Sequence, residues 1–186
     1  MKDPRATLPV VEDMEEWAER FEGRWLDHVR CKVLGVPGAE PDWSLYEGPR
    51  NRIAPAGRAV RLSESRLILV SSAGASLRSR SEPFDAENVL GDPTLRLIPM
   101  TAPLSDVRFD HTHYDHSPVS VDPQVQLPLR HLEEMAADGK IGGLAENVVS
   151  FSGYQPDVRA VADLVAPGVL AAARTEKADA ALLVPA

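Results

Sequence analysis

Residues 110–116, DHTHYDH, concentrate side chains that can bind metals, move protons or hold anions. Three of the chain's five histidines lie here, at His111, His113 and His116, and Asp115 precedes the last of them. Imidazoles near carboxylates can act as general acids, or as cations that hold a carboxylate substrate. The same residues also form ordinary polar loops, in which histidines bond locally and cap helix or strand ends. Three interpretations are open: a metal site, a metal-free active-site loop and a structural loop.

The spacing H-x-H-x-D-H resembles the pattern of the metallo-β-lactamase superfamily, in which a two-metal site performs hydrolysis. Two imidazoles two residues apart can hold one metal ion, and an Asp-His pair can hold a second. Such a site needs further ligands from distant segments, and the only later histidine, His131, lies on the next predicted helix. The sequence therefore favours a site without metal, and a metal-dependent hydrolase is the less favoured alternative.

Alternating strands and helices must position this segment. The sequence predicts strands over residues 66–70, 95–100, 147–153 and 179–186, and helices over 128–142 and 156–177. Short continuous apolar runs such as RLILV are typical of strands covered on both faces. This order predicts an α/β fold with a mostly parallel sheet and flanking helices, in a Rossmann-like three-layer arrangement.

The carboxyl ends of the predicted strands carry small residues. Ligands of such sheets bind outside these ends, so we expect residues 71–74, residues 152–154 and the end of the chain to converge. The turn after residue 70 lacks the spacing of a dinucleotide fingerprint or a P-loop, so it predicts no nucleotide. The candidate substrate-binding residues at these ends are Ser71, Ser72, Gly74, Gly153 and Tyr154.

The N-terminal part is expected to lie outside this core. Apolar residues recur at spacings of three and four over residues 11–34, which predicts an amphipathic helix that packs on the core or on a partner. A proline-rich arm over residues 36–62 connects this helix to the core. We expect a single α/β domain over 1–186, with the helix and arm in 1–60 and the core in 61–186.

Composition limits the classes of function. A formal charge of −8 argues against a nucleic-acid surface, which needs a basic stripe. The sequence has no apolar run of about 18 residues, the length that spans a bilayer, and we expect no secretory signal. The single cysteine, Cys31, excludes an internal disulfide. It fits a reducing compartment, so a cytoplasmic protein is expected.

Four stretches resemble the B-component family of glycine, sarcosine and betaine reductases and D-proline reductase. They are SESRLILVSSAGA, HTHYDHSPVSVDPQVQLPLRHLEEMAADGKIGG, VVSFSGY and ADAALLVPA, all within residues 60–186. The resemblance implies that a selenol or thiol attacks the substrate carbon that bears the amine, and that a dithiol or thioredoxin-like reductant closes the cycle. In the amino-acid reductases of this family, a pyruvoyl group on a partner subunit activates the amine.

In this family the reactive residue directly follows a strand like ALLVP. The sequence stops at Pro185 and Ala186. We therefore expect a selenocysteine or cysteine just after Ala186 in the natural protein, no cofactor in the chain as given, and no reduction by this chain alone. The alternative is a non-catalytic binding or partner module of the same fold. A homodimer is also possible, through the final strand or the N-terminal helix.

The roles left to the histidine segment are supporting ones. His113 and His116 are predicted to donate protons or contact an anion, and Asp115 to orient one of them. His111 completes the set of catalytic candidates.

The small residues at the strand ends would contact a small-molecule substrate. Backbone N–H groups of Ser71, Ser72 and Gly74 are predicted to face it. Gly153 would permit close approach of the backbone, next to Tyr154.

Overall fold

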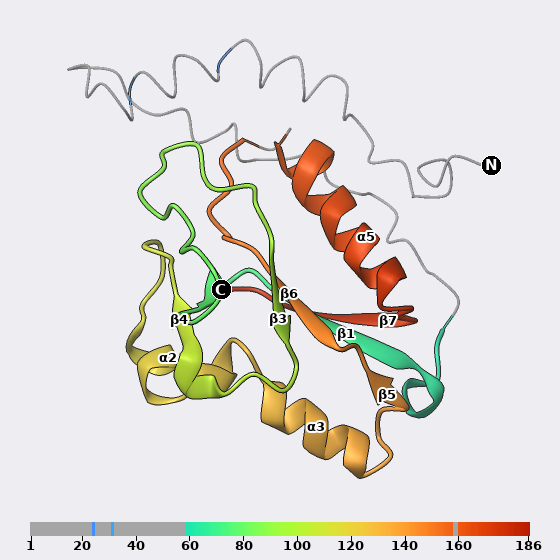
Figure 1. Ribbon diagram of the computed structural model, residues 1–186. Coiled ribbons are helices and arrows are strands. Elements are labelled where there is room, and N and C mark those ends of the chain that lie inside the picture. The colour runs from blue at the N-terminus through green and yellow to red at the C-terminus, as the bar shows by residue number, and fades with distance from the viewer. Residues whose placement is uncertain (1–23, 25–30, 32–58, 158–159) are drawn as a thin grey trace. The chain divides into compact units, whose positions relative to one another are not determined.

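A computed structural model of the protein describes residues 24, 31, 59–157 and 160–186 (Figure 1). The chain divides into two compact units, Met1–Arg58 and Ala59–Ala186. The helix predicted over residues 11–34 and most of the proline-rich arm lie outside the described residues. Arg24 and Cys31 are described and are helical. The N-terminal helix and the single-domain organisation therefore stay predictions.

The second unit alternates strands with helices. Its strands are β1 (Arg66–Ser71), β2 (Ala75–Leu77), β3 (Arg96–Pro99), β4 (Val107–Phe109), β5 (Gly143–Leu144), β6 (Asn147–Ser150) and β7 (Ala180–Val184). Its α-helices are α2 (Ser117–Val121), α3 (Leu129–Ala137) and α5 (Ala166–Thr175). Short 3-10 helices are η3 (Leu62–Glu64), η4 (Leu104–Asp106) and η5 (Pro123–Val125), and the π-helical η6 (Val161–Val165) continues into α5. The four predicted strands and both predicted helices are thus present; β1 extends one residue further than predicted, and the other elements have shorter bounds.

Strand β1 lies inside a five-stranded mixed sheet. Strand β7 pairs with it in parallel, from Leu67 opposite Ala180 to Ser71 opposite Val184. Strands β5 and β6 also pair with β1 in parallel, near its start and near its end, and β3 pairs antiparallel with β6. The structure therefore confirms an α/β fold with mostly parallel pairing around β1. The Rossmann-like three-layer arrangement stays a prediction.

Side chains of β1 alternate between two hydrophobic clusters. Leu69 is fully buried in the larger cluster together with Leu132 of α3. Ile68 is fully buried in the smaller cluster, against which Val169 of α5 packs. Burial of each such side chain contributes roughly 1.5–3 kcal/mol. Both faces of β1 are covered, as its continuous apolar run predicts, and Figure 1 shows α5 and α3 on opposite sides of the sheet.

A second, two-stranded antiparallel sheet follows β1 directly. Its strands β2 and β4 place Ala75 opposite Phe109 and Leu77 opposite Val107. Ala75, Leu77 and Val107 belong to the larger hydrophobic cluster. This small sheet was not predicted, because its strands have only three residues each and no clear apolar alternation. It brings the end of β4, where the histidine segment begins, next to the end of β1.

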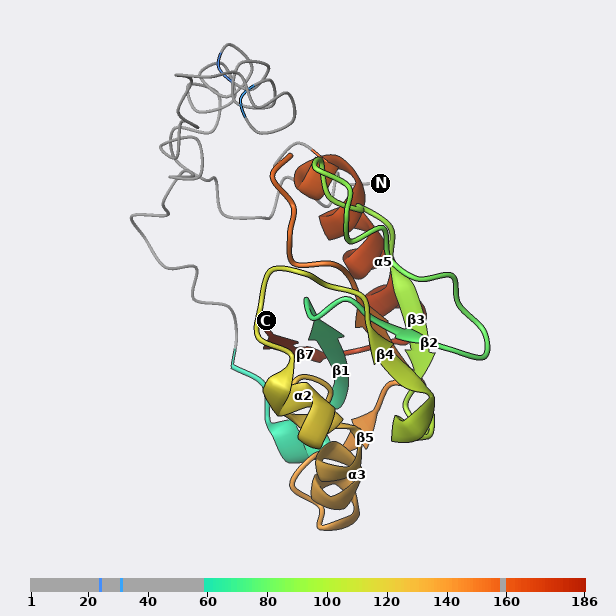
Figure 2. The same ribbon diagram turned by 90° about the vertical axis from the view of Figure 1, so that its left-hand side faces the viewer.

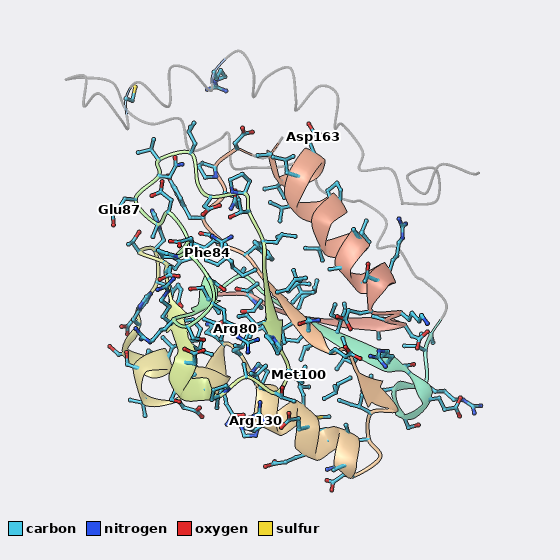
Figure 3. All side chains as sticks on the ribbon, in the orientation of Figure 1. Arg80, Phe84, Glu87, Met100, Arg130 and Asp163 are labelled. Atoms are coloured by element: carbon cyan, nitrogen blue, oxygen red, sulfur yellow. The ribbon has the colours of Figure 1, made fainter. Side chains whose placement is uncertain are left out.

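The start of helix α3 is tied to the end of β3. The guanidinium of Arg130 donates to the carbonyl oxygens of Met100 and Ala102 at 2.6 and 3.2 Å. Figure 3 shows Arg130 and Met100 at this junction. The helix begins after Pro128, one residue later than predicted, and ends before Gly139, whose φ of +71° places it in the left-handed region. None of the described helices has the length and hydropathy that a membrane span needs.

Candidate functional site

The carboxyl ends of β1, β6 and β7 meet at one edge of the sheet. The N–H of Ser72 donates to the carbonyl oxygen of Val184 at 3.1 Å, and the N–H of Ala186 donates to the Ser72 hydroxyl at 2.9 Å. The N–H of Gly74 donates to the carbonyl oxygen of Phe151 at 2.9 Å. Figure 2 shows the last residue beside the end of β1. The predicted convergence of the three strand ends is confirmed.

Two glycines allow these segments to lie close together. Gly74 has a φ of +65°, and a Cβ at this position would lie 2.9 Å from the carbonyl oxygen of Asp110. A Cβ at Gly153 would lie 3.0 Å from the carbonyl oxygen of Ser72. The close approach predicted at Gly153 therefore takes place, and it is an approach to the protein's own backbone. Larger residues at either position would push the strand ends apart.

The serines at the end of β1 are engaged within the protein. Ser71 is fully buried, and its hydroxyl donates to the carbonyl oxygen of Gln126 at 3.0 Å. The same hydroxyl accepts a bond of 3.3 Å from the N–H of Ala73. The N–H groups of Ser72 and Gly74 already donate to backbone carbonyls. Their donation to a substrate stays a prediction, and it requires these bonds to open.

The histidine segment lies over the ends of both β1 and β6. The hydroxyl of Tyr114 donates to the carbonyl oxygen of Ala73, just after β1, at 3.1 Å. The exposed imidazole of His113 stacks on the ring of Tyr154, just after β6, with centroids 3.8 Å apart and an interplanar angle of 4°. The segment predicted to carry proton donors is thus held beside the predicted substrate contacts. The sequence did not indicate the partners that hold it.

His111 is the buried member of the segment, with 8% of its surface exposed. Its Nδ1 accepts a hydrogen bond of 3.0 Å from the N–H of His113, which assigns the ring proton to Nε2. Burial lowers the pKa of His111, and the charges of His113 and His116 lower it further. A neutral imidazole suits a group that positions the backbone of His113 better than it suits a proton donor.

The two remaining candidates differ in their surroundings. The exposed carboxylate of Asp115 accepts bonds from the N–H and the hydroxyl of Ser117 at 2.9 and 2.7 Å. These bonds lower the pKa of Asp115. No hydrogen bond joins Asp115 to a histidine among the described residues, so its orienting role stays a prediction. The Nε2 of His116 is buried and has no hydrogen-bond partner within the described part of the chain. The centroid of the His116 ring lies 4.5 Å from that of the Tyr114 ring.

Asp110 anchors the start of the segment. Its Oδ2 accepts bonds from the Ser76 hydroxyl at 2.5 Å, from the Arg108 Nε at 3.3 Å and from the Phe84 N–H at 3.3 Å. Burial, and then the charge of Asp110, raises the pKa of Tyr114 to about 12. Arg108 was not among the predicted site residues. It precedes Asp110 by two positions, and side chains two residues apart lie on the same face of an extended strand. This spacing could have indicated the contact between Arg108 and Asp110.

The metal-dependent alternative requires several ligands that face one centre. In the part of the chain that the structure describes, no group of three or more His, Cys, Asp or Glu side chains is arranged to hold a metal ion. The rings of His111 and His113 are nearly perpendicular, with centroids 5.7 Å apart. The ring of His113 faces Tyr154 instead of a shared centre.

Comparison with known proteins identifies a distant relative. Over 122 residues, the chain is 28% identical to D-proline reductase subunit gamma of Acetoanaerobium sticklandii. The match covers 66% of this chain and 49% of the relative, so the chain spans about half of that relative's length. No family model matches the chain, and no solved structure matches it significantly. The chain is thus distantly related to the proline and glycine reductase family.

Proposed function

We propose that this protein is a component of a reductase that cleaves a carbon–nitrogen bond of an amino-acid-type substrate with electrons from a dithiol. The observation that carries the proposal is the attachment of the histidine segment to the converging strand ends. His113 stacks on Tyr154 at 3.8 Å, and the N–H of Ala186 reaches the Ser72 hydroxyl at 2.9 Å. The distant relationship to a D-proline reductase subunit supports the same class of reaction.

The two thiol groups of the reductant supply all the electrons that the proposed reaction needs. A selenol or thiol of the enzyme attacks the carbon that bears the amine, and the electron pair of the broken carbon–nitrogen bond goes to nitrogen, which takes a proton. One thiol of the reductant then attacks the sulfur or selenium, and the substrate carbon leaves with a proton. The second thiol releases the enzyme's selenol or thiol. The substrate gains two electrons and two protons, and the dithiol becomes a disulfide.

Residues of the histidine segment would serve the proton transfers. The exposed ring of His113 would give a proton to the leaving nitrogen, next to the predicted substrate contact Tyr154. His111, which accepts the N–H of His113 at 3.0 Å, would position that residue. His116 would contact the substrate's carboxylate. Asp115 would orient one of these two histidines.

The reducing group is proposed to be a selenocysteine or cysteine at the carboxyl end of β7. The resemblance implies this place, and the chain's single cysteine, Cys31, lies outside the resembling region. Intact mass and selenium content of the protein isolated from its host would test it. Selenium, or a thiol mapped directly after β7, would support the proposal. A host protein without selenium and with Cys31 as its only thiol would refute it.

A partner subunit is proposed as well, because the relative is itself named as a subunit. A thioredoxin-like protein or a small dithiol would supply the electrons. We place this reaction in the cytoplasm, where dithiol reductants are maintained.

The activity test uses the complex isolated from the host. Dithiothreitol would be supplied with D-proline, glycine, sarcosine or betaine, and the product followed by NMR. His113→Gln is expected to lower kcat by about 10²-fold or more, since it removes a general acid. His131→Gln is the matched control, because His131 is exposed on α3. No dithiol-dependent consumption of any of the four substrates would exclude the proposed reductase.

A binding module of the same fold is the second candidate. It is favoured by the lack of cysteine in residues 59–186. Such a module would bind substrate or a partner subunit and would leave the redox step to another chain. Mapping the reactive group in the complex from the host distinguishes the two candidate functions. A selenol or thiol on this polypeptide supports the reductase, and one on its partner subunit supports the binding module.

A further inference from the structure

A pocket with a volume of about 480 Å³ opens between β4 and α2. Two residues of the histidine segment, Asp110 and His116, line this β4–α2 pocket. Apolar side chains line part of it, among them Leu104, Val107 and Val119. Its polar lining consists of Arg78, Ser105, Arg108, Asp110, His116 and Ser120. Three nitrogen-bearing side chains therefore face one hollow in a chain whose formal charge is −8.

The two arginines differ in how firmly they are held. Arg108 is half-buried, and its Nε donates to the Ser76 hydroxyl at 2.9 Å while its Nη2 donates to the Ser81 carbonyl oxygen at 2.6 Å. These bonds fix the guanidinium and leave Nη1 as its remaining donor group. Arg78 is exposed, and its side chain has no partner among the described residues. The pocket thus has one fixed guanidinium and one that is able to close over a ligand.

The acidic group of the pocket is already compensated. Asp110 Oδ2 accepts bonds from Ser76, Arg108 and Phe84. The neighbouring carboxylate of Asp106, which does not line the pocket, accepts bonds from both the N–H and the hydroxyl of Ser79. Among the lining residues, two guanidinium groups and one carboxylate leave a net charge of about +1.

His116 supplies the third contact. Its Nε2 is buried and has no hydrogen-bond partner among the described residues, although the ring lines the pocket. A buried nitrogen without a partner is unfavourable, so a ligand that bonds to it gains affinity from a group that nothing else satisfies.

We propose that the β4–α2 pocket binds a small organic molecule with a single carboxylate group. Arg78 and Arg108 would hold the carboxylate, because guanidinium groups match its planar geometry. His116 would bond to the same group or to a hydroxyl beside it, and the apolar wall would cover a short carbon chain. One net positive charge fits a singly charged group better than a phosphate dianion. The proposal shares its His116 contact with the proposed reductase function, but binding of a carboxylate can be measured without the reductase reaction.

Titration of the full chain with sodium acetate, followed by ¹H–¹⁵N NMR at constant ionic strength, tests the proposal. Saturable shifts are expected for the amides of residues around the pocket, with a Kd near the millimolar range. Sodium chloride and inorganic phosphate are the comparison ligands. Shifts that rise linearly with acetate, or that chloride reproduces, would show no specific site. Tighter binding of phosphate than of acetate would refute the preference for a single carboxylate.

Arg78→Met is the decisive variant, with Arg80→Met as its matched control. Both remove an exposed arginine from one turn, but Arg80, labelled in Figure 3, lines a different pocket. Arg78→Met is expected to weaken acetate binding about tenfold, the effect of losing one charge-assisted contact. Arg80→Met should leave it unchanged, and unshifted amides elsewhere would show intact folding in both. Equal effects of the two variants would mean general charge attraction and would overturn the proposal.

Discussion

Replacement of Tyr114 by phenylalanine removes the bond that fastens the histidine segment to the end of β1. The Tyr114 hydroxyl donates to the carbonyl oxygen of Ala73 at 3.1 Å, and Ala73 is fully buried. Phenylalanine keeps the ring and its contact with His111, whose centroid lies 4.9 Å away. The substitution therefore tests the hydrogen bond apart from the aromatic packing.

The expected loss follows from the state of the carbonyl group that remains. A hydrogen bond between neutral groups contributes about 0.5–1.5 kcal/mol net, whereas a buried group left without a partner costs about 1–3 kcal/mol. The hydroxyl is half-buried, so water can partly replace it. We expect Tyr114→Phe to lower the free energy of unfolding by about 1.5 kcal/mol, near the lower part of that second range.

Urea unfolding followed by circular dichroism measures this loss, and Tyr154→Phe is the control. The hydroxyl of Tyr154 donates to the exposed Val89 carbonyl oxygen at 3.3 Å, a longer bond in contact with water. Phenylalanine at this position keeps the ring that stacks on His113. The control should lose less than about 0.5 kcal/mol, as is usual for surface substitutions. An equally small loss in Tyr114→Phe would refute the anchoring role.

Alkaline pH tests the surroundings of the same hydroxyl, because burial and the charge of Asp110 oppose its ionisation. The pKa of Tyr114 is raised from 10.0 to about 12, so folding favours the protonated phenol. The resulting stability is present below pH 10 and is lost as the pH rises through about 12. Two pKa units correspond to at most about 2.7 kcal/mol, and partial exposure reduces this to about 1 kcal/mol. The difference in stability between wild type and Tyr114→Phe should therefore shrink from about 1.5 to about 0.5 kcal/mol above pH 12. A constant difference would contradict the assignment.

Three further perturbations test other parts of the fold and site. Gly74→Ala should lower the free energy of unfolding by about 3 kcal/mol, because the φ of Gly74 is positive and the new Cβ would lie 2.9 Å from a backbone oxygen. Gly139 also has a positive φ, but nothing lies within 4 Å of a Cβ there. Gly139→Ala should therefore lower the free energy of unfolding by only about 1 kcal/mol in the same urea assay. The pKa of His111 is lowered by folding, so the unfolded state binds more protons than the folded state at pH values below 6.5. The free energy of unfolding should therefore fall as the pH drops from 6.5. His111→Gln should remove part of this pH dependence of stability. Leu132→Ala, in the core under α3, should cost about 2–5 kcal/mol, and a loss below 1 kcal/mol would contradict its burial.

The main strands were predictable because runs of apolar side chains in the sequence indicate buried positions. The run over β1 is apolar at every position from Leu67 to Val70, and all four side chains are buried. Strand β3 was also predicted, but its antiparallel direction was not. Direction depends on the connections before and after β3 and on its neighbours in the sheet, and neither leaves a local pattern in Arg96–Pro99.

Short elements escaped prediction for a different reason. No helix was predicted between the histidine segment and Pro128, yet α2 occupies Ser117–Val121. A five-residue helix has too few turns for a repeating apolar face, and only Val119 of α2 is buried. The same holds for β5, with two residues. These elements form because tertiary contacts stabilise them, so single-sequence periodicity does not identify them.

The site was predictable in its place and not in its contacts. Because ligands bind at the carboxyl ends of parallel strands, Ser72 and Ala186 were predicted to lie close together, and the structure confirms this. It gave no indication that His113 would stack on Tyr154, because that contact depends on the path of the chain through β2 and β4.

The small β2–β4 sheet explains why the histidine segment lies at the end of β1. Gly74 leaves β1 with a positive φ, its carbonyl oxygen accepts the N–H of Asp110 at 2.8 Å, and only a glycine fits against the Asp110 backbone. The pairing of Ala75 with Phe109 then continues this contact. The histidines therefore begin one residue after a fixed backbone junction. A substitution that opens this junction should displace the whole segment from the sheet edge, whatever chemistry the histidines perform.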